Sequence, residues 1–317
     1  MRNRGFQFLL ILCFGVMLLF PSKVFTGAKA GLLLWFLTVL PTLFPFLLMS
    51  RLLLDSCACS FLNRLFDPLL CRLFCISSQG SFAVIVGFLC GYPMGAKATA
   101  DLLKSKQITL SEASYLLAFC NNTSPAFLIS YIILGCFHNS SLLLPSILIL
   151  YGTPILLSFF FRAKNPFFAK SCAENKSSFE SSAQVTNTID FDACLTDSSE
   201  SIIKIGGYII LFSILLNLLH DFPIANPLFR ALFLPSLELT NGIALLNKTM
   251  SVPITAHSFS LFYSLCMGHA AFGGWCAIFQ TGSMIAKSGL SLKSYILKKL
   301  VTALVTSLIA YLYIYCS

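Results

Sequence analysis

The chain has 317 residues, of which 57% are apolar and 10% are charged, and its mean hydropathy is +0.84. A soluble domain carries about 25% charged residues, so this composition excludes an ordinary soluble protein and predicts a chain that lies in a lipid bilayer. The 21 Lys and Arg exceed the 12 Asp and Glu, which in a membrane protein marks cytoplasmic loops rather than nucleic-acid binding. Most of the 13 cysteines fall in apolar runs, without zinc-site spacing, so we expect no metal and no cofactor.

The N-terminus combines positive charge with an apolar run. Arg2 and Arg4 precede the run 6–20, a pattern typical of a signal sequence or of a first membrane helix. We interpret residues 1–29 as a retained N-terminal helix, a signal anchor, followed by a loop, because another apolar run begins directly afterwards. Cleavage of a signal peptide near Ala28 is the alternative.

The first half of the chain, residues 30–162, contains both full and broken apolar runs. Its runs are 30–54, 62–75, 82–100, 113–137 and 142–161. A full span needs about 20 residues, so the run 62–75 is too short. The next run is interrupted by Gly91, Pro93 and Gly95. We expect these two runs together to form a re-entrant hairpin.

The second half, residues 201–317, repeats this order of elements. Its runs are 202–219, 227–246, 258–282 and 295–315. Pro235 and Gly242 break the run 227–246, as the glycines and proline break the first hairpin. The stretch 163–200 between the halves is rich in Ser, Asn, Asp and Lys, so we expect a flexible cytoplasmic loop there.

The positions of Lys and Arg predict the orientation of the chain, because these residues accumulate in cytoplasmic loops. Lys104, Lys106, the 163–200 loop and residues 287–299 are expected inside, which places the N-terminus in the cytoplasm and the C-terminus outside. The first half then starts outside and the second half inside. Inverted repeats with interrupted helices are typical of transporters whose site lies at the bilayer midplane. The predicted fold class is an all-α, polytopic membrane bundle with two inverted repeats and re-entrant hairpins.

A glycine- and proline-rich break at residues 91–97 is the first candidate site. Backbone groups freed at membrane depth are tolerated only where they line a cavity or pack inside protein, and such a break can aim a helix N-terminus at an anion. Gly91, Gly95 and Lys97 are therefore candidate substrate-binding residues. The alternative is a lysine that snorkels at the cytoplasmic edge, beside glycines that only permit close packing.

A polar cluster near the middle of the run 113–137 is the second candidate site. Polar side chains in lipid are costly unless paired, and these supply amide and hydroxyl donors for a polar solute. The candidate binding residues are Asn121, Asn122, Thr123, Ser124 and Pro125. Hydrogen bonding between helices, without a ligand, is the alternative.

The matching place in the second half is the stretch 268–274. Gly273 and Gly274 permit unwinding or a close backbone approach. His269 can donate to a carboxylate or relay a proton, and a packed, hydrogen-bonded histidine is the alternative. No combination of residues typical of an enzyme appears in the sequence. We therefore expect no catalytic residues and interpret the chain as a non-enzyme.

Four segments carry a resemblance to a known family. They are 87–97 (GFLCGYPMGAK), 119–125 (FCNNTSP), 268–274 (GHAAFGG) and 292–299 (LKSYILKK). Together they resemble the sporulation integral membrane protein YlbJ family, which is part of the nucleoside-recognition gate superfamily. The resemblance extends over nearly the whole chain after the first helix, and it implies that residues 30–162 and 201–317 are two inverted gate repeats.

The resemblance also implies a function. The family is associated with spore formation and with export of dipicolinate, a small aromatic dicarboxylate, from the mother cell across the outer forespore membrane. We therefore expect a multi-pass transporter of a small organic anion, surrounded by lipid and without a nucleic-acid partner. A non-transporting membrane scaffold for spore cortex and envelope assembly, and a passive channel, are the alternatives. Whether copies of the chain form a homo-oligomer is left open.

Overall fold

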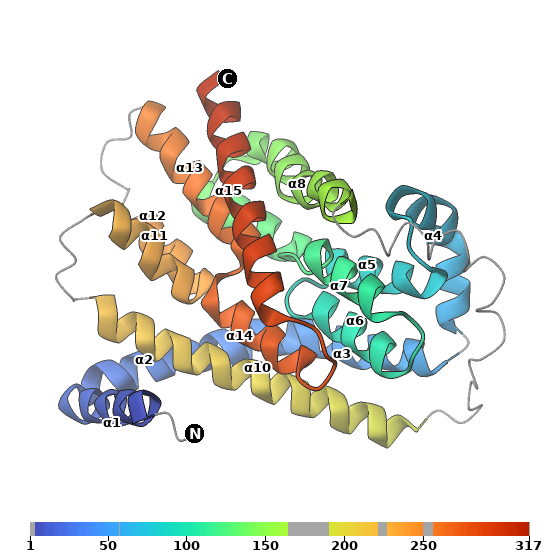
Figure 1. Ribbon diagram of the computed structural model, residues 1–317. Coiled ribbons are helices and arrows are strands. Elements are labelled where there is room, and N and C mark those ends of the chain that lie inside the picture. Colours follow the sequence, from blue (N-terminus) through green and yellow to red (C-terminus); the bar gives the residue numbers. More distant parts are fainter. Residues whose placement is uncertain (1–3, 57, 164–189, 221–226, 250–255, 317) are drawn as a thin grey trace.

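The structure, a computed structural model, describes residues 4–56, 58–163, 190–220, 227–249 and 256–316, and its regular elements there are helices (Figure 1). They are α1 (Arg4–Leu19), α2 (Pro21–Leu34), η1 (Trp35–Val39), α3 (Leu40–Asp55), α4 (Ala58–Phe74), α5 (Ser78–Leu89), α6 (Met94–Lys104), α7 (Leu110–Phe119), η2 (Phe127–Phe137), η3 (Ser140–Leu142), α8 (Leu143–Ala163), α10 (Phe191–His220), α11 (Pro227–Leu237), α12 (Leu239–Thr249), α13 (Ala256–Phe272), α14 (Gly274–Ile285) and α15 (Leu292–Cys316). Five helical stretches in the described residues are long and apolar enough to cross a membrane, or six if the bent pair α4–α5 counts as one span. The predicted all-helical, multi-pass membrane architecture is confirmed.

Two long helical stretches lie side by side along one edge of the molecule. Helices α2, η1 and α3 form a single stretch from Pro21 to Leu54, which packs along α10 (Figure 1). Glycines permit this packing, since a Cβ atom at Gly27 would lie 2.7 Å from the Cα of Ile214, and one at Gly31 would lie 2.7 Å from the Cα of Ile210. The contacts run in opposite chain directions, so the two stretches are antiparallel.

Helices α2 and α10 both begin earlier in the chain than the sequence predicted. Residues 21–29 are helical, so the loop expected before residue 30 is replaced by the first turns of α2. Residues 191–200 form the first turns of α10, although the flexible loop was expected to reach residue 200. The backbone N–H of Ala193 donates to the Asp190 carboxylate at 3.0 Å and so caps the start of α10. The rest of the expected loop, 164–189, lies outside the described residues.

The first hairpin turns twice rather than once. Helices α4 and α5 meet at an angle of 93°, which fits either a broken span or a re-entrant segment, and a second reversal at residues 90–93 folds α6 back onto α5. The turn before α5 is anchored by Glu112 of α7, whose carboxylate accepts hydrogen bonds at 2.7 Å from both the backbone N–H and the hydroxyl of Ser77. Burial raises the pKa of the Glu112 carboxyl, and these two hydrogen bonds oppose that rise. In the second half, α11 and α12 also pack against each other as a hairpin.

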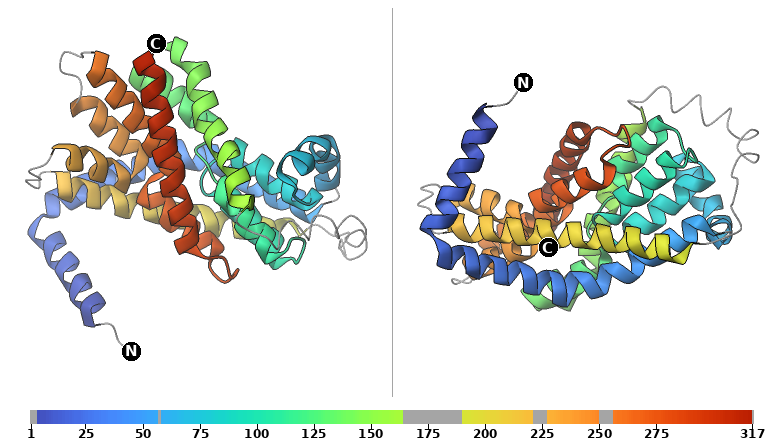
Figure 2. Two further views of the ribbon diagram at one scale, coloured as in Figure 1. Left: turned by 45° about the horizontal axis from the view of Figure 1, so that its top comes forward. Right: turned by 90° about the horizontal axis from the view of Figure 1, so that it is seen from below.

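The remaining helices enclose the centre of the bundle. Helices α13 and α15 pack along each other, and α8 packs against α15 (Figure 2). The α13–α14 stretch is the most enclosed of the candidate spans, with 83% of its apolar window buried. Helix α1, by contrast, is largely exposed, contacts α2 and extends away from the bundle (Figure 2). The centre of the molecule is therefore built around the break between α13 and α14.

Candidate functional site

Three interruptions of helices meet at the centre of the bundle. They are the turn between α5 and α6, the extended residues between α7 and η2, and the kink between α13 and α14. The Tyr92 hydroxyl donates to the carbonyl of Ala271 at 2.8 Å, and the Thr123 hydroxyl donates to the carbonyl of Ala270 at 2.5 Å. We call this region the helix-break junction and define it as residues 91–93, 121–124 and 270–274. The structure thus brings together segments of all three motifs singled out in the sequence.

Two glycines make this close approach sterically feasible. Gly91 and Gly273 both adopt a φ of +84°, in the left-handed region that favours glycine. A Cβ atom at Gly91 would lie 2.6 Å from the backbone nitrogen of Ser124, and one at Gly273 would lie 2.6 Å from the Tyr92 ring. A larger residue at either position would force two of the breaks apart.

A third glycine of the first motif permits backbone packing. A Cβ atom at Gly95 would lie 2.5 Å from the carbonyl oxygen of Cys120, and a Cβ atom at Gly87 of α5 would overlap the same oxygen. The end of α7 therefore rests directly on the crossing of α5 and α6. In this structure Gly95 packs against the backbone of Cys120. Its predicted role in substrate binding stays a prediction.

Asn121 connects the polar cluster to three different helices. Its side chain is almost fully buried, with 1% exposure. Its amide nitrogen donates to the Thr281 hydroxyl at 3.0 Å and to the Tyr295 hydroxyl at 2.8 Å, while its amide oxygen accepts from the backbone N–H of Ala96 at 3.3 Å. Ala96 is in the first turn of α6, where backbone N–H groups lack partners within the helix. Asn121 therefore occupies the helix N-terminus that the sequence analysis assigned to an anion.

The other residues of the polar cluster differ in burial. Asn122 and Thr123 are buried, and the amide nitrogen of Asn122 donates to the carbonyl of Phe119 at 2.7 Å. Ser124 and Pro125 are partly exposed, and the Ser124 hydroxyl accepts from the backbone N–H of Phe127 at 3.3 Å, at the start of η2. The cluster therefore combines buried groups at the junction with a capping residue at its edge.

Lys299 of α15 lies at the junction and was absent from the candidate residues. It is 1% exposed, and its ammonium group donates to the backbone oxygen of Asn121 at 2.9 Å and to the amide oxygen of Asn122 at 3.3 Å. The same group lies 5.0 Å from the centroid of the Tyr92 ring. Among the described residues, no carboxylate lies within 4.0 Å of it. A buried positive charge with neutral partners thus contacts two of the three breaks.

Lys299 was missed because residues 287–299 were interpreted as one cytoplasmic stretch. A signal in the sequence was nevertheless present. Polar side chains recur at Tyr295, Lys299, Thr302 and Thr306, which is the spacing of one helical face. All four are buried in α15, so this stripe marks the face that packs inside the bundle.

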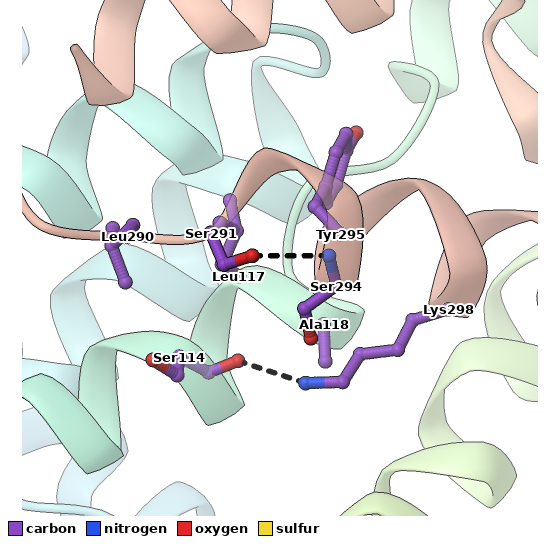
Figure 3. Close-up of a pocket in the computed structure, with 8 residues that line it drawn as sticks. All are labelled: Ser114, Leu117, Ala118, Leu290, Ser291, Ser294, Tyr295 and Lys298. Atoms are coloured by element: carbon purple, nitrogen blue, oxygen red, sulfur yellow. Dashed lines mark hydrogen bonds between the residues drawn. The ribbon is translucent and has the colours of Figure 1, made fainter.

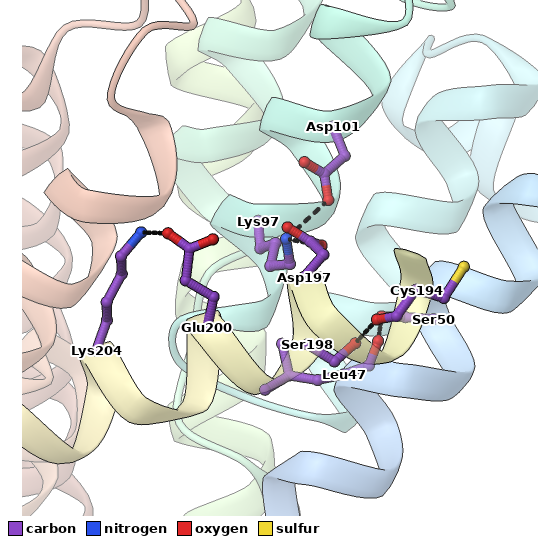
Figure 4. A network of polar contacts seen from close by, with 9 residues as sticks. All are labelled: Leu47, Ser50, Lys97, Asp101, Cys194, Asp197, Ser198, Glu200 and Lys204. Atoms are coloured by element: carbon purple, nitrogen blue, oxygen red, sulfur yellow. Dashed lines mark hydrogen bonds and ion pairs between the residues drawn. The ribbon is translucent and has the colours of Figure 1, made fainter. Parts of the chain in front are cut away.

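Lys97 has a different environment from the one expected. It is 7% exposed, and its ammonium group lies 2.7 Å from the carboxylate of Asp197 and 3.3 Å from that of Asp101 (Figure 4). Asp197 is in the part of α10 that was expected to be a loop. The two carboxylates neutralise Lys97 and tie α6 to α10, so its assignment to anion binding stays a prediction without support from this geometry.

The remaining candidates lie on the side of the second hairpin. His269 is buried, and its Nε2 atom lies 3.3 Å from the carbonyl of Ala231 on α11, an arrangement that fits a packed histidine. A Cβ atom at Gly274 would lie 2.9 Å from the carbonyl of Ser236, so this glycine permits contact between the second hairpin and the third break. Glu238, also missed, is buried at the tip of that hairpin and accepts a hydrogen bond from the backbone N–H of Asn241 at 2.8 Å.

A small pocket lies between α7 and α15, beside the helix-break junction (Figure 3). Its volume is about 50 Å³, and it is lined by Ser114, Leu117, Ala118, Leu290, Ser291, Ser294, Tyr295 and Lys298. The ammonium group of Lys298 donates to the carbonyl of Ser114 at 3.3 Å. Tyr295 belongs both to the pocket lining and, through its hydroxyl, to the hydrogen bonds of Asn121. Among the described residues, no group of three His, Cys, Asp or Glu side chains is placed to hold a metal ion.

Comparison with known proteins finds a similarity to the "Sporulation integral membrane protein YlbJ" of Bacillus subtilis (strain 168). The two sequences are 35% identical over 122 residues, which is 38% of this chain and 30% of the Bacillus protein. The matched region therefore spans less than a third of that relative. No protein-family profile matches the chain, and no solved structure matches it. The similarity confirms, at the level of the family, the resemblance drawn from the sequence motifs.

Proposed function

We propose that this protein is a multi-pass membrane transporter that acts in endospore formation and moves a small organic anion, dipicolinate, from the mother cell across the outer forespore membrane. The observation that carries the proposal is the meeting of three helix breaks at the centre of a lipid-embedded bundle, around the buried residues Tyr92, Asn121 and Thr123. Irregular backbone at membrane depth is tolerated where it is enclosed by protein or lines a cavity. Discontinuous helices of this kind form the substrate sites of many transporters.

The arrangement of the two halves supports an inverted repeat. The helical stretch Pro21–Leu54 of the first half and α10 of the second half pack antiparallel. Each half also has a hairpin whose tip rests on a break of the same half, at Gly91 against Ser124 and at Gly274 against Ser236. Substrate would bind between the halves, and rocking of one half against the other would expose it to each side in turn.

The proposed location follows from the family resemblance and from the distribution of charge. The name of the Bacillus relative assigns that protein to sporulation and to a membrane. For this chain we propose the outer forespore membrane, with a cytoplasmic N-terminus, an external C-terminus and no enzymatic activity. The bilayer surrounds the exposed apolar side chains of helices such as α8 and α15.

Transport by the purified protein tests the proposal. Proteoliposomes that contain the wild-type chain should accumulate labelled dipicolinate above protein-free liposomes. Asn122→Ala should reduce this uptake at least about tenfold, because it removes an amide at the junction that also accepts from Lys299. Asn139→Ala, in an exposed loop, is the matched control and should transport normally. Wild-type uptake no greater than that of empty liposomes would contradict the proposal.

One observation favours the alternative of a non-transporting scaffold for spore envelope assembly. Both amide atoms of Asn121 are fully engaged by groups of the protein itself, as expected if the polar cluster only holds helices together. The two functions differ in a sporulating cell. A variant that folds and reaches the membrane but does not transport, such as Asn122→Ala, should restore spore maturation if the protein is a scaffold and should fail to restore it if the protein is a transporter.

A further inference from the structure

We infer that Lys299 is the residue that binds the negative charge of the transported anion. This inference rests on the proposed transport function and deepens it, because it identifies the charged group that would bind the solute's carboxylate. Lys299 ends the motif segment 292–299, but the sequence analysis gave it no binding role, since the candidate positive charge was Lys97.

The burial of Lys299 is the first argument. An ionised side chain removed from water is strongly destabilised unless it is paired and hydrogen-bonded. Lys299 is 1% exposed and lies in a helix that is long and apolar enough to cross the membrane. An ionisable residue inside a membrane segment is by default a functional candidate. An anion bound beside the amine would stabilise its charged form, which burial alone disfavours.

The partners of Lys299 are the second argument. Its two hydrogen-bond acceptors, the backbone oxygen of Asn121 and the amide oxygen of Asn122, are both neutral. The Tyr92 ring adds a cation–π contact, which is also neutral. Lys97, in contrast, is neutralised by two carboxylates. Among the described residues, the Lys299 amine is therefore hydrogen-bonded to neutral groups without a nearby carboxylate, and a bound anion would supply the charge that stabilises its ammonium form.

The position of Lys299 at the junction is the third argument. The ammonium group touches the break after α7 through Asn121 and the break after α5 through Tyr92. The hydroxyl of Tyr92 in turn holds the third break, at Ala271. A carboxylate that displaces one of these contacts would alter the positions of all three breaks, so binding at Lys299 is placed to drive a conformational change.

The adjoining pocket indicates the direction of access. It lies on the α7 side of α15 and is bordered by Lys298, three serines and Tyr295 (Figure 3). A volume of about 50 Å³ accommodates water but is well below the roughly 300 Å³ of a typical small-molecule site. An aromatic dicarboxylate therefore requires α15 to move relative to α7. The hydroxyls and the ammonium group of this pocket suit the first contact with an anion, before it reaches Lys299.

The test uses two probes of matched shape, the dianion pyridine-2,6-dicarboxylate and its neutral diamide, pyridine-2,6-dicarboxamide. Proteoliposome uptake and ligand-induced thermal stabilisation of the full-length protein in detergent are both measured. In the wild type, the dianion should be taken up and should stabilise the protein, whereas the diamide should do neither. Lys299→Met should weaken both dianion responses by roughly 100-fold in half-saturating concentration, as expected for loss of one partner of a buried charge pair. Lys293→Met, which removes an exposed lysine of the same helix, is the control and should behave as the wild type.

The outcomes separate the inference from the proposed function. Suppose that the wild type takes up the dianion, and that Lys299→Met takes it up and is stabilised by it as well as the wild type is. That result would overturn the inference and leave the transport function standing. Absence of wild-type uptake would overturn the transport function, and thermal stabilisation would still decide whether Lys299 binds the dianion. If Lys299→Met does not yield folded protein, Lys299→Gln takes its place, because glutamine keeps donor N–H groups without the charge. A wild type that the dianion does not stabilise would also overturn the inference.

Discussion

At the scale of single residues, backbone conformation and side-chain size are coupled at the helix breaks. Gly91 and Gly273 adopt the same positive φ, and each faces a different partner across the junction, Ser124 and Tyr92. The Tyr92 ring contacts both Gly273 and the ammonium group of Lys299. The position of the Tyr92 ring therefore affects both how closely the breaks at Gly91 and Gly273 approach each other and the cation–π contact of Lys299.

Gly273→Ala tests this coupling. The added methyl group meets the Tyr92 ring, and alanine is strained at a φ of +84°. We expect a loss of unfolding free energy of about 1–3 kcal/mol, seen as a lower midpoint of thermal unfolding in detergent. Gly152→Ala in α8 is the matched control, because a Cβ atom there has no neighbour within 4 Å and alanine is the better helix former. Equal midpoints for the two variants would contradict the assigned role of Gly273.

At the scale of elements, a buried ion pair joins the first hairpin to α10. Lys97 and Asp101 belong to α6, and Asp197 belongs to the first turns of α10 (Figure 4). Asp197 keeps 43% exposure of its side chain, so solvent screens this partner more than the lysine. The pair nevertheless links segments that are 100 residues apart in the sequence.

Replacement of Lys97 should therefore destabilise the contact between α6 and α10. Lys97→Met leaves the carboxylate of Asp101, which is 12% exposed, without its cation, and we expect a loss of about 2 kcal/mol of unfolding free energy. Lys204→Met is the matched control, because Lys204 pairs with Glu200 on the exposed face of the same α10, and its loss should have no measurable effect. Thermal unfolding of both variants provides the comparison. If the anion site instead used Lys97, its replacement would abolish uptake while leaving the unfolding midpoint unchanged.

The comparison of sequence and structure also belongs to the scale of elements. The breaks at Gly91, Asn121 and Gly273 could be predicted because glycine, proline and polar residues interrupt apolar runs, and interruption is a local property. The start of α10 could not be predicted, since residues 191–200 are mostly polar and show no apolar helical stripe. They become a packed helix through contacts with α3 and through the ion pair with Lys97.

Lys299 and Glu238 illustrate the same limit within the site. A lysine before an apolar run, taken alone, has the pattern of a cytoplasmic anchor, and the polar stripe of α15 was the one local signal that set Lys299 apart. Lys299 is placed at the junction by the packing of α15 against α13 and α7, which only the tertiary structure determines. Glu238 similarly precedes a short helix, α12, and its burial depends on the fold of the second hairpin.

At the scale of the whole molecule, segments that were predicted to be cytoplasmic lie near one another. The stretch 287–291 approaches the start of α7, where a Cβ atom at Gly289 would lie 3.9 Å from the Leu110 side chain. Lys298 donates to Ser114 of the same α7, and α6 contacts the first turns of α10 through Lys97. Several lysine-bearing segments thus lie close together, and the side of the membrane that they face stays a prediction.

A pair of reporter fusions tests this orientation in a bacterial membrane. Alkaline phosphatase is active only outside the cytoplasm, and green fluorescent protein fused to an exported end stays dark. With the C-terminus outside, phosphatase fused after Ser317 should be active and the fluorescent fusion dark, whereas fusions after Ala163, at the end of α8, should give the opposite result. A fluorescent C-terminal fusion would place both ends of the second half on the same side. It would remove the basis for an inverted repeat, because the two halves would no longer cross the membrane in opposite directions. The antiparallel packing of Pro21–Leu54 on α10 would then not reflect a repeat. Lys299 would still lie buried beside neutral partners, so a channel or scaffold that binds an anion there would become the better description of the molecule.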